Sequence, residues 1–254
     1  MKKLLLLALL SCCFFPAQAQ KILVKPYVLG LVDDFEGRNW AKDNPEENTL
    51  VDKFHSTEVS LVTYLDSLIK EENKRTYDKV LITNVKWEKK DCYYCQEFRR
   101  IMSKQMVAQM HEAYSFKWKD LEDEKHYKIY TGVLKPKFLE KDQERYSFLA
   151  GAYVRYGSNE EDLYSFKLSS SKSKFDAILR ELKTLKCTIK KVDVKEGETI
   201  LQQVTFIPSP NLKAYLDKQE RLRLDILRRK EKHFKERNQG QNGTDLFSAG
   251  PEQD

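Results

Sequence analysis

The spacing of hydrophobic and polar residues predicts a mixture of helices and strands. Over residues 57–74 an apolar residue recurs every three or four positions, which is typical of an amphipathic helix. After residue 125 the period changes to two, which is typical of strands with one buried face. The unbroken apolar run Val80-Leu81-Ile82 predicts a central strand at 79–87.

The same patterns predict eleven elements along the chain. Strands are expected at 22–29, 79–87, 127–133, 146–156, 164–168, 187–194 and 199–207, and helices at 57–74, 95–116, 173–186 and about 211–237. The order is β-α-β-α-β-β-β-α-β-β-α, with Gly157 to Glu160 as a turn and no internal sequence repeat. Because hairpins dominate after residue 125, we expect an α+β fold, with about four helices on one face of a mostly antiparallel sheet.

The first 19 residues have the features of a cleaved secretory signal peptide. Lys2 and Lys3 precede an apolar run that is too short to span a bilayer, and an A-x-A cleavage pattern ends at Ala19. The alternative is a lipoprotein signal with Cys12 as the lipidated residue. We therefore expect an exported protein of the periplasm, cell envelope or medium. Residues 20–238 would form a single domain and 239–254 a disordered tail.

The net charge of +6 is concentrated near the C-terminus. Residues 213–237 hold ten Lys or Arg and five Asp or Glu, so the rest of the chain is close to neutral. This distribution disfavours a general nucleic-acid binder and favours a partner protein, an anionic membrane surface or an acidic polysaccharide at the last helix. The candidate binding residues are Arg228, Arg229, Lys230, Lys232, Lys235 and Arg237.

Three cysteines follow the signal segment, namely Cys92, Cys95 and Cys187. In an oxidising compartment we expect a disulfide, either Cys92–Cys95 or one of these two with Cys187, and one thiol left over. If a helix begins at the Cys92-x-x-Cys95 pair, its N-terminal N–H groups and Lys89 and Lys90 would stabilise a thiolate at Cys92.

The order of strand, Trp87, Cys-x-x-Cys and helix resembles the redox segment of the thioredoxin family over about thirty residues. The resemblance implies that Cys92 is the nucleophile and Cys95 the resolving thiol. A thioredoxin-like thiol–disulfide oxidoreductase is therefore the alternative function.

Other candidate sites have simpler explanations. Met102, Met106 and Met110 lie near the cysteine pair and could bind Cu(I), but such a row is typical of a core. The acidic residues Asp33, Asp34 and Glu36 lack the alternation of a calcium loop. Two Ser-x-x-Lys matches, at 169–172 and 171–174, lack the partner motifs of serine acyl-enzymes.

These patterns together predict no metal, no cofactor and no catalytic residue beyond the cysteine candidates. The expected function is an exported, non-catalytic α+β protein that binds a partner or an envelope component.

Overall fold

The computed structural model describes residues 21–90, 92–195, 197 and 199–245. Its helices are α2 (Val24–Leu31), α3 (Phe35–Arg38), α4 (Val59–Asn73), α5 (Lys104–His111), α6 (Asp142–Tyr156), α7 (Lys172–Thr184) and α8 (Pro210–Asp245), with 3-10 turns η1 (Ser56–Glu58) and η2 (Tyr93–Glu97). Its strands are β1 (Trp40–Ala41), β2 (Leu50–His55), β3 (Thr83–Lys86), β4 (Phe98–Met102), β5 (Tyr114–Glu122), β6 (Lys128–Leu134), β7 (Gly157–Glu160), β8 (Leu163–Ser169), β9 (Thr188–Lys195) and β10 (Leu201–Ile207). The predicted α+β class is confirmed.

The strands form three antiparallel sheets, in the orders β1-β6-β5, β2-β4-β3 and β7-β8-β10-β9. The expected alternation holds in β8, where Tyr164, Phe166 and Leu168 are buried, and in β10, where Val204 and Phe206 face them. Period-two patterning identified these strands because one face of their sheet is exposed.

The centre of the molecule is a pair of helices, α2 and α6, that the sequence analysis assigned wrongly to strands at 22–29 and 146–156. Both are buried on nearly every side, so neither shows the 3.6-residue period. Their backbones meet at two glycines. A Cβ on Gly30 would lie 2.0 Å from the Phe148 carbonyl oxygen, and one on Gly151 would lie 2.0 Å from that of Tyr27.

The two halves of the chain share one connectivity, although their sequences show no repeat. The first runs α2, β1, α5, β5, β6, with the short α3 added after α2, and the second runs α6, β8, α7, β9, β10, with β7 added after α6. In each half the early strand pairs with the last strand of the later hairpin, β1 with β6 and β8 with β10. The segment from β2 to β4 is inserted in the first half.

The cysteine segment lies in this insertion and differs from its prediction. Residues 79–87 hold only the short, exposed edge strand β3, and 95–116 is not one helix. Instead η2 leads into β4, and Ser103 then caps α5 by accepting the Met106 N–H at 3.2 Å. The apolar row that predicted one helix is shared by β4, α5 and β5, and its members Met106 and Met110 belong to the core.

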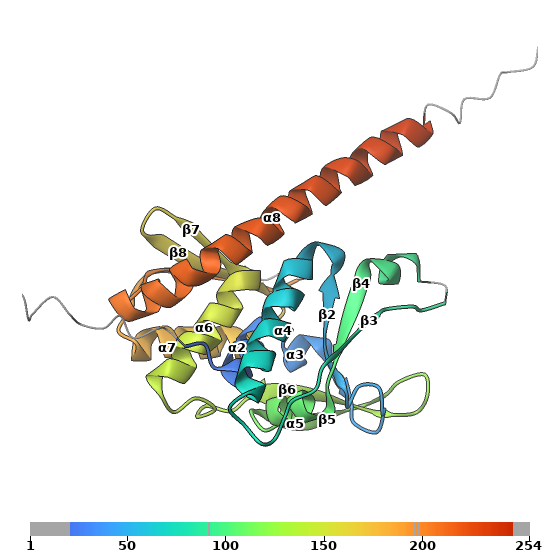
Figure 1. Cartoon of the computed structure of the whole chain (residues 1–254), viewed down its shortest axis with the longest axis horizontal. Coiled ribbons are helices and arrows are strands. Elements are labelled where there is room, and N and C mark those ends of the chain that lie inside the picture. Colours follow the sequence, from blue (N-terminus) through green and yellow to red (C-terminus); the bar gives the residue numbers. More distant parts are fainter. Residues whose placement is uncertain (1–20, 91, 196, 198, 246–254) are drawn as a thin grey trace, which may run out of the picture.

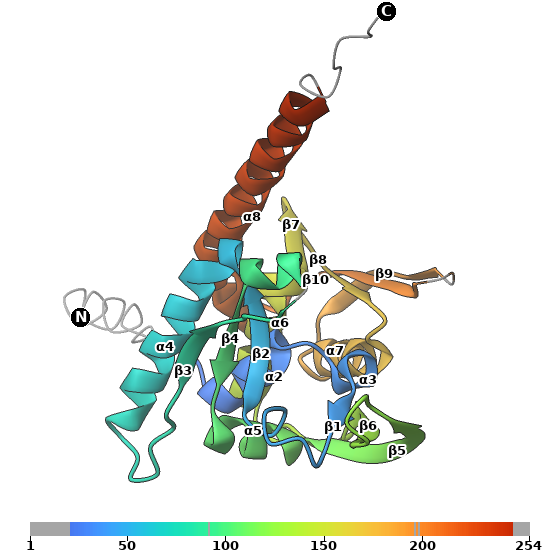
Figure 2. The same cartoon turned by 90° about the vertical axis from the view of Figure 1, so that its right-hand side faces the viewer.

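The last helix, α8, packs along its first half and then leaves the body (Figures 1 and 2). Leu212, Leu216 and Ile226 are buried, as their 3-4 spacing predicts. Gln219 joins three helices, because its side chain accepts the Tyr27 hydroxyl and donates to that of Tyr64, both at 3.1 Å. No helix within the described ranges combines the length and the apolar character needed to cross a bilayer.

Candidate functional site

The chain leaving α2 forms one wall of a polar cavity of about 430 Å³. Residues 169–171, at the end of β8 and just after it, form the opposite wall. Gly37 lets the two walls approach, because a Cβ there would lie 2.9 Å from the Ser170 carbonyl oxygen. The residues that line this acidic pocket are Asp33, Asp34, Gly37, Arg38, Asp52, Lys53, Ser169, Ser170 and Ser171.

A buried ion network lies behind the pocket, centred on Arg155 of α6. Its guanidinium donates to Asp52 Oδ2 at 2.7 Å and to the two Glu58 oxygens at 3.1 and 3.0 Å. All three side chains are at most 10% exposed. Burial, the largest single effect, would raise the pKa of Asp52 and of Glu58, but Arg155 acts together with Arg38 or Lys230 and with backbone N–H donors to hold each pKa below its ordinary value.

The other two cations of the network donate mainly to backbone carbonyls. Arg38 donates to the carbonyl oxygens of Val51 at 2.6 Å and Leu50 at 2.7 Å. The ammonium of Lys174 donates to the carbonyls of Gly30, at 3.2 Å, and of Val32. Burial lowers the pKa of Lys174 to about 8, although nearby carboxylates oppose the shift. Arg38 and Lys174 are therefore already hydrogen-bonded to the protein backbone around the pocket.

Two carboxyl groups of the pocket are less well neutralised. The Asp33 carboxyl is 61% exposed, and its Oδ1 accepts the Tyr156 hydroxyl at 3.1 Å. Repulsion from Asp52, and then burial, raise the pKa of Asp33. Asp34 Oδ2 accepts the Lys174 N–H at 2.9 Å, but its Oδ1 is buried without a hydrogen-bond partner. Burial raises the pKa of Asp34 as well.

The serines do not form a nucleophile–lysine pair. The hydroxyl of Ser171 donates to the carbonyl oxygen of Ser169 at 3.0 Å, while the Lys174 ammonium is occupied by carbonyls of the chain after α2. Ser170 adopts a φ of 48°, which turns the chain sharply at the pocket wall. The Ser-x-x-Lys spacing therefore reflects a helix start and a buried cation.

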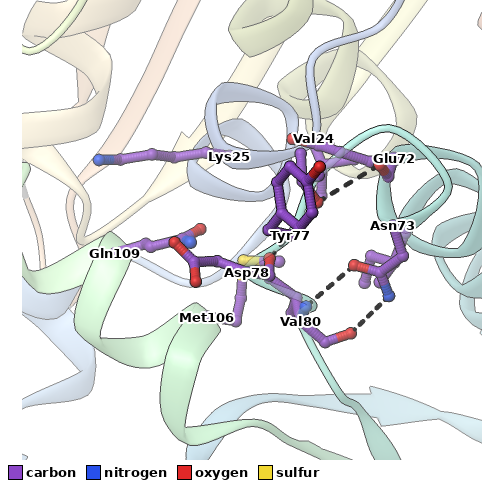
Figure 3. Close-up of a pocket in the computed structure, with 11 residues that line it drawn as sticks. Val24, Lys25, Glu72, Asn73, Tyr77, Asp78, Val80, Met106 and Gln109 are labelled. Carbon is purple, nitrogen blue, oxygen red and sulfur yellow. Dashed lines mark hydrogen bonds between the residues drawn. The ribbon is translucent and has the colours of Figure 1, made fainter.

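A second cavity of about 430 Å³ lies between α2, α4, α5 and the loop after α4 (Figure 3). Val24, Val80 and Met106 give it apolar walls. The Asn73 amide fixes the loop by bonding the Val80 carbonyl at 2.8 Å and the Val80 N–H at 2.9 Å. Lys25 extends away from it and pairs with Glu112 at 2.6 Å. This cavity lacks the converging buried charges of the acidic pocket.

The predicted redox pair lies far in the chain from the acidic pocket, in the turn between β3 and β4. A disulfide joins Cys92, which caps η2, to Cys95 within it, with their Cα atoms 5.4 Å apart. No α-helix begins at Cys92, so the N-terminal N–H groups expected to stabilise its thiolate are missing there. Cys187 is a free, half-buried thiol whose pKa is raised by burial.

The predicted basic residues lie on the projecting half of α8, where most face carboxylates. Arg228 and Arg229 pair with Asp225 at 3.1 and 2.8 Å. Lys230 lies 3.8 Å from Glu58 and Lys232 lies 3.7 Å from Glu236. Lys235 and Arg237 are exposed. The helix therefore carries a mixed pattern of charge.

No protein-family profile matches the chain, and no curated protein matches it. Three solved structures that resemble it are of the homing endonuclease I-DmoI, each at 14% identity. Mesophilic variants cover 76% of this chain and 93% of their own, with a TM-score of 0.46. A complex of a variant with its target DNA and manganese covers 77% and 92%, with a TM-score of 0.44, and another complex with DNA and manganese covers 78% and 94%, with a TM-score of 0.38.

These structures are of a DNA-binding endonuclease, and they contradict several predictions from the sequence. The prediction of a non-catalytic protein that binds a partner or an envelope component, its thioredoxin-like alternative, the descriptors of secretion and the exclusion of nucleic acid are therefore withdrawn. These structures do not test where the protein is located. With TM-scores below 0.5, the likeness assigns neither activity nor DNA binding to this chain. Cleavage after Ala19 and lipidation at Cys12 concern residues outside the described ranges and stay predictions.

Sequence reasoning singled out Asp33 and Asp34 but assigned them no binding role, and it considered Lys174 only as part of a Ser-x-x-Lys match. It missed Asp52 and Arg155. A signal for Arg155 was present, since an arginine within a run of aromatic and small residues needs buried acidic partners. Its partners come from β2 and η1, about a hundred residues away in sequence, and only the fold brings them together.

Proposed function

We propose that the acidic pocket binds a small organic cation, a molecule carrying a primary amine or a guanidinium group. The observation that carries the proposal is the contrast between its cations and its acids. Arg38, Arg155 and Lys174 already donate to protein oxygens. Although Arg155 lies 3.8 Å from Asp33, repulsion from Asp52 raises the pKa of Asp33, and burial raises that of Asp34. A further cation in the pocket would offset both effects.

The hydrogen-bonding groups of the pocket favour a ligand that donates. Asp33 offers an exposed carboxylate, and the wall adds the hydroxyl-bearing residues Ser169 and Ser170, which are both exposed. An ammonium or guanidinium group is a donor without an acceptor, so it matches this set. A volume of about 430 Å³ suits a small molecule. Within the described part of the chain, no three carboxyl groups of the pocket lie close enough to share one metal ion, which favours an organic cation.

The test is calorimetric titration of the full chain with agmatine, putrescine and arginine methyl ester. We expect saturable binding, weakened about tenfold or more by Asp33→Asn, because a hydrogen bond to a charged group contributes about 1.5–3 kcal/mol. Asp162→Asn, in the exposed turn between β7 and β8, is the matched control and should bind like wild type.

The pH dependence has a definite sign. A bound cation favours ionised Asp33 and Asp34, so their raised pKa values fall on binding and protons are released. Affinity should therefore rise as the pH increases through those raised values. If none of the three amines binds, or if Asp33→Asn binds as well as Asp162→Asn, the proposal is wrong. Manganese binding that depends on Asp33 without amine binding would replace the organic cation with a metal.

A further inference from the structure

The structure brings two histidines and a glutamate from three separate segments to one point beside α8. His55 is the last residue of β2, Glu97 ends η2 and His233 lies on α8. Glu97 Oε2 lies 3.0 Å from His55 Nε2 and 3.4 Å from His233 Nε2, and the three donor atoms lie within 4.8 Å of one another. We propose that this His55–Glu97–His233 cluster is a zinc site that fastens α8 to the body.

The donor set and its spacing suit zinc. Two imidazoles and a carboxylate are ligands that Zn²⁺ takes at about 2.0–2.2 Å, which puts the donors of a tetrahedral site about 3.3 Å apart. The two distances to Glu97 Oε2 are already close to that value. Small rotations of exposed side chains bring the histidines into range. Their charge also fits, because one carboxylate and two neutral imidazoles leave the ion a net positive charge and a position for water.

A second residue is placed to orient His55. The Thr57 hydroxyl lies 2.8 Å from Nδ1 of the ring. When His55 binds metal through Nε2, its proton resides on Nδ1, and Thr57 Oγ1 can accept it, as the outer partners of metal-bound histidines do. The Thr57 N–H, 3.2 Å from the same Nδ1, favours the opposite tautomer without metal. Zinc binding therefore moves the His55 proton and exchanges one Thr57 contact for another.

The surroundings hold the cluster in place while leaving it reachable. The Cys92–Cys95 disulfide closes the turn that carries Glu97. The rings of His55 and His233 lie edge to face, 4.9 Å apart. The three side chains are 19%, 27% and 30% exposed, so a hydrated ion can enter and retain water.

The position of the cluster indicates what the ion would do. α8 passes the end of β2 at this point and then continues away from the body (Figure 2). The pKa of Glu97 is lowered chiefly by its hydrogen bond with His55, then by the charges of His233 and His55, and least by Arg237, which lies one turn beyond His233. Zinc would compete with that arginine for Glu97 and tie the projecting half of α8 to both η2 and β2.

The experiment uses the tag-free full chain, with zinc titrated by calorimetry and cobalt by visible absorption. We expect one ion per chain, with cobalt bands typical of a four-coordinate site. His233→Ala and Glu97→Gln should each weaken binding roughly tenfold or more. His126→Ala is the control, because His126 pairs with Glu122 in an exposed turn and should be dispensable.

A second measurement follows α8 itself. Zinc should slow tryptic cleavage near Arg228 and Arg229 in wild type and in His126→Ala but not in His233→Ala, whose half-buried position on a helix tolerates alanine. Zinc binding that both ligand variants retain, or the absence of saturable binding, would overturn the zinc site. Cluster-dependent binding without protection of α8 would overturn the fastening role.

Discussion

Arg155→Met is the most informative change to the ion network behind the acidic pocket. The substitution keeps a long side chain but removes the positive charge that Asp52 and Glu58 share. It also removes the donor to the Lys53 carbonyl at 2.9 Å. Both carboxylates are at most 5% exposed, so water cannot replace the guanidinium without opening the structure.

The expected loss is large. Removing one partner of a buried, hydrogen-bonded ion pair costs about 3–5 kcal/mol, because the remaining charge is left in a poorly solvating interior. A domain of ordinary stability has about 5–15 kcal/mol in total, so the variant should remain folded but marginal. Arg229→Met removes a half-exposed arginine from its pair with Asp225 and should cost at most about 1 kcal/mol.

The loss should depend on pH with a definite sign. In wild type the pKa values of Asp52 and Glu58 are lowered, so their contribution is present above the unfolded values and is lost as the pH falls through the folded ones. Without Arg155, burial raises both pKa values instead. Protonation of Asp52 and Glu58 then removes the buried charges that Arg155 no longer balances. The difference in free energy of unfolding between the variant and wild type should therefore shrink between pH 7 and pH 5.

Urea unfolding followed by tryptophan fluorescence measures both quantities, with Arg229→Met as the matched control. A deficit of about 1 kcal/mol or less at pH 7, or one that does not change with pH, would show that the network is solvated or that its charges are compensated elsewhere. Arg155→Lys refines the result, because lysine keeps the charge but cannot donate to both carboxylates in a fork.

Three further changes test other parts of the fold. Gly151→Ala should lower the free energy of unfolding by about 1–3 kcal/mol, because its Cβ would meet backbone 2.0 Å away, whereas Gly197→Ala, with no atom nearer than 4.0 Å, should change thermal stability little. Lys174→Met should abolish a gain in stability of about 1 kcal/mol between pH 7 and 9. The folded pKa of Lys174 is about 8, so between pH 7 and 9 the unfolded state of wild type binds more protons than the folded state, and the free energy of unfolding rises with pH. The difference between the wild-type and variant urea curves at each pH isolates this contribution. Replacing Cys92 and Cys95 by serine should lower the free energy of unfolding by about 2 kcal/mol on the loop-entropy estimate, and an unchanged urea midpoint would contradict this. The same change should weaken zinc binding, since Glu97 lies two residues after Cys95 in η2.

Prediction from sequence succeeded where an element has one exposed face. α4, α7, β8 and β10 were found because water on one side imposes a regular alternation of polar residues. It failed for α2 and α6, which are enclosed by other elements and need no polar face. Their nearly continuous apolar runs fit a buried strand equally well. Gly30 and Gly151 indicate a close helix contact only once the fold shows that each faces the backbone of the other helix.

The candidate sites were harder to predict, for a related reason. Asp33 and Asp34 were visible as an acidic turn, but their chemistry depends on Asp52, Arg155 and Lys174, which arrive from other elements. His55, Glu97 and His233 are likewise too far apart in sequence to suggest a cluster. Cys92 and Cys95 were conspicuous because they are close in sequence, and that closeness made a helix start plausible where the fold has a hairpin turn.

Glu58 gives a physical reason to consider the two proposed sites together. Its carboxylate holds Arg155 behind the acidic pocket, and its Oε2 also accepts the backbone N–H of His55 at 3.0 Å, as part of the turn that orients the zinc cluster. A buried ion network rarely contributes more stability than apolar residues of similar size would. The network is better explained by the side chains that it holds in position than by the stability that it contributes. The network fixes Asp33 at the pocket through Tyr156 and Arg155, and it fixes His55 beside α8 through Glu58. A change in Glu58 should therefore reach both sites, whereas Asp33 and His233 each belong to one.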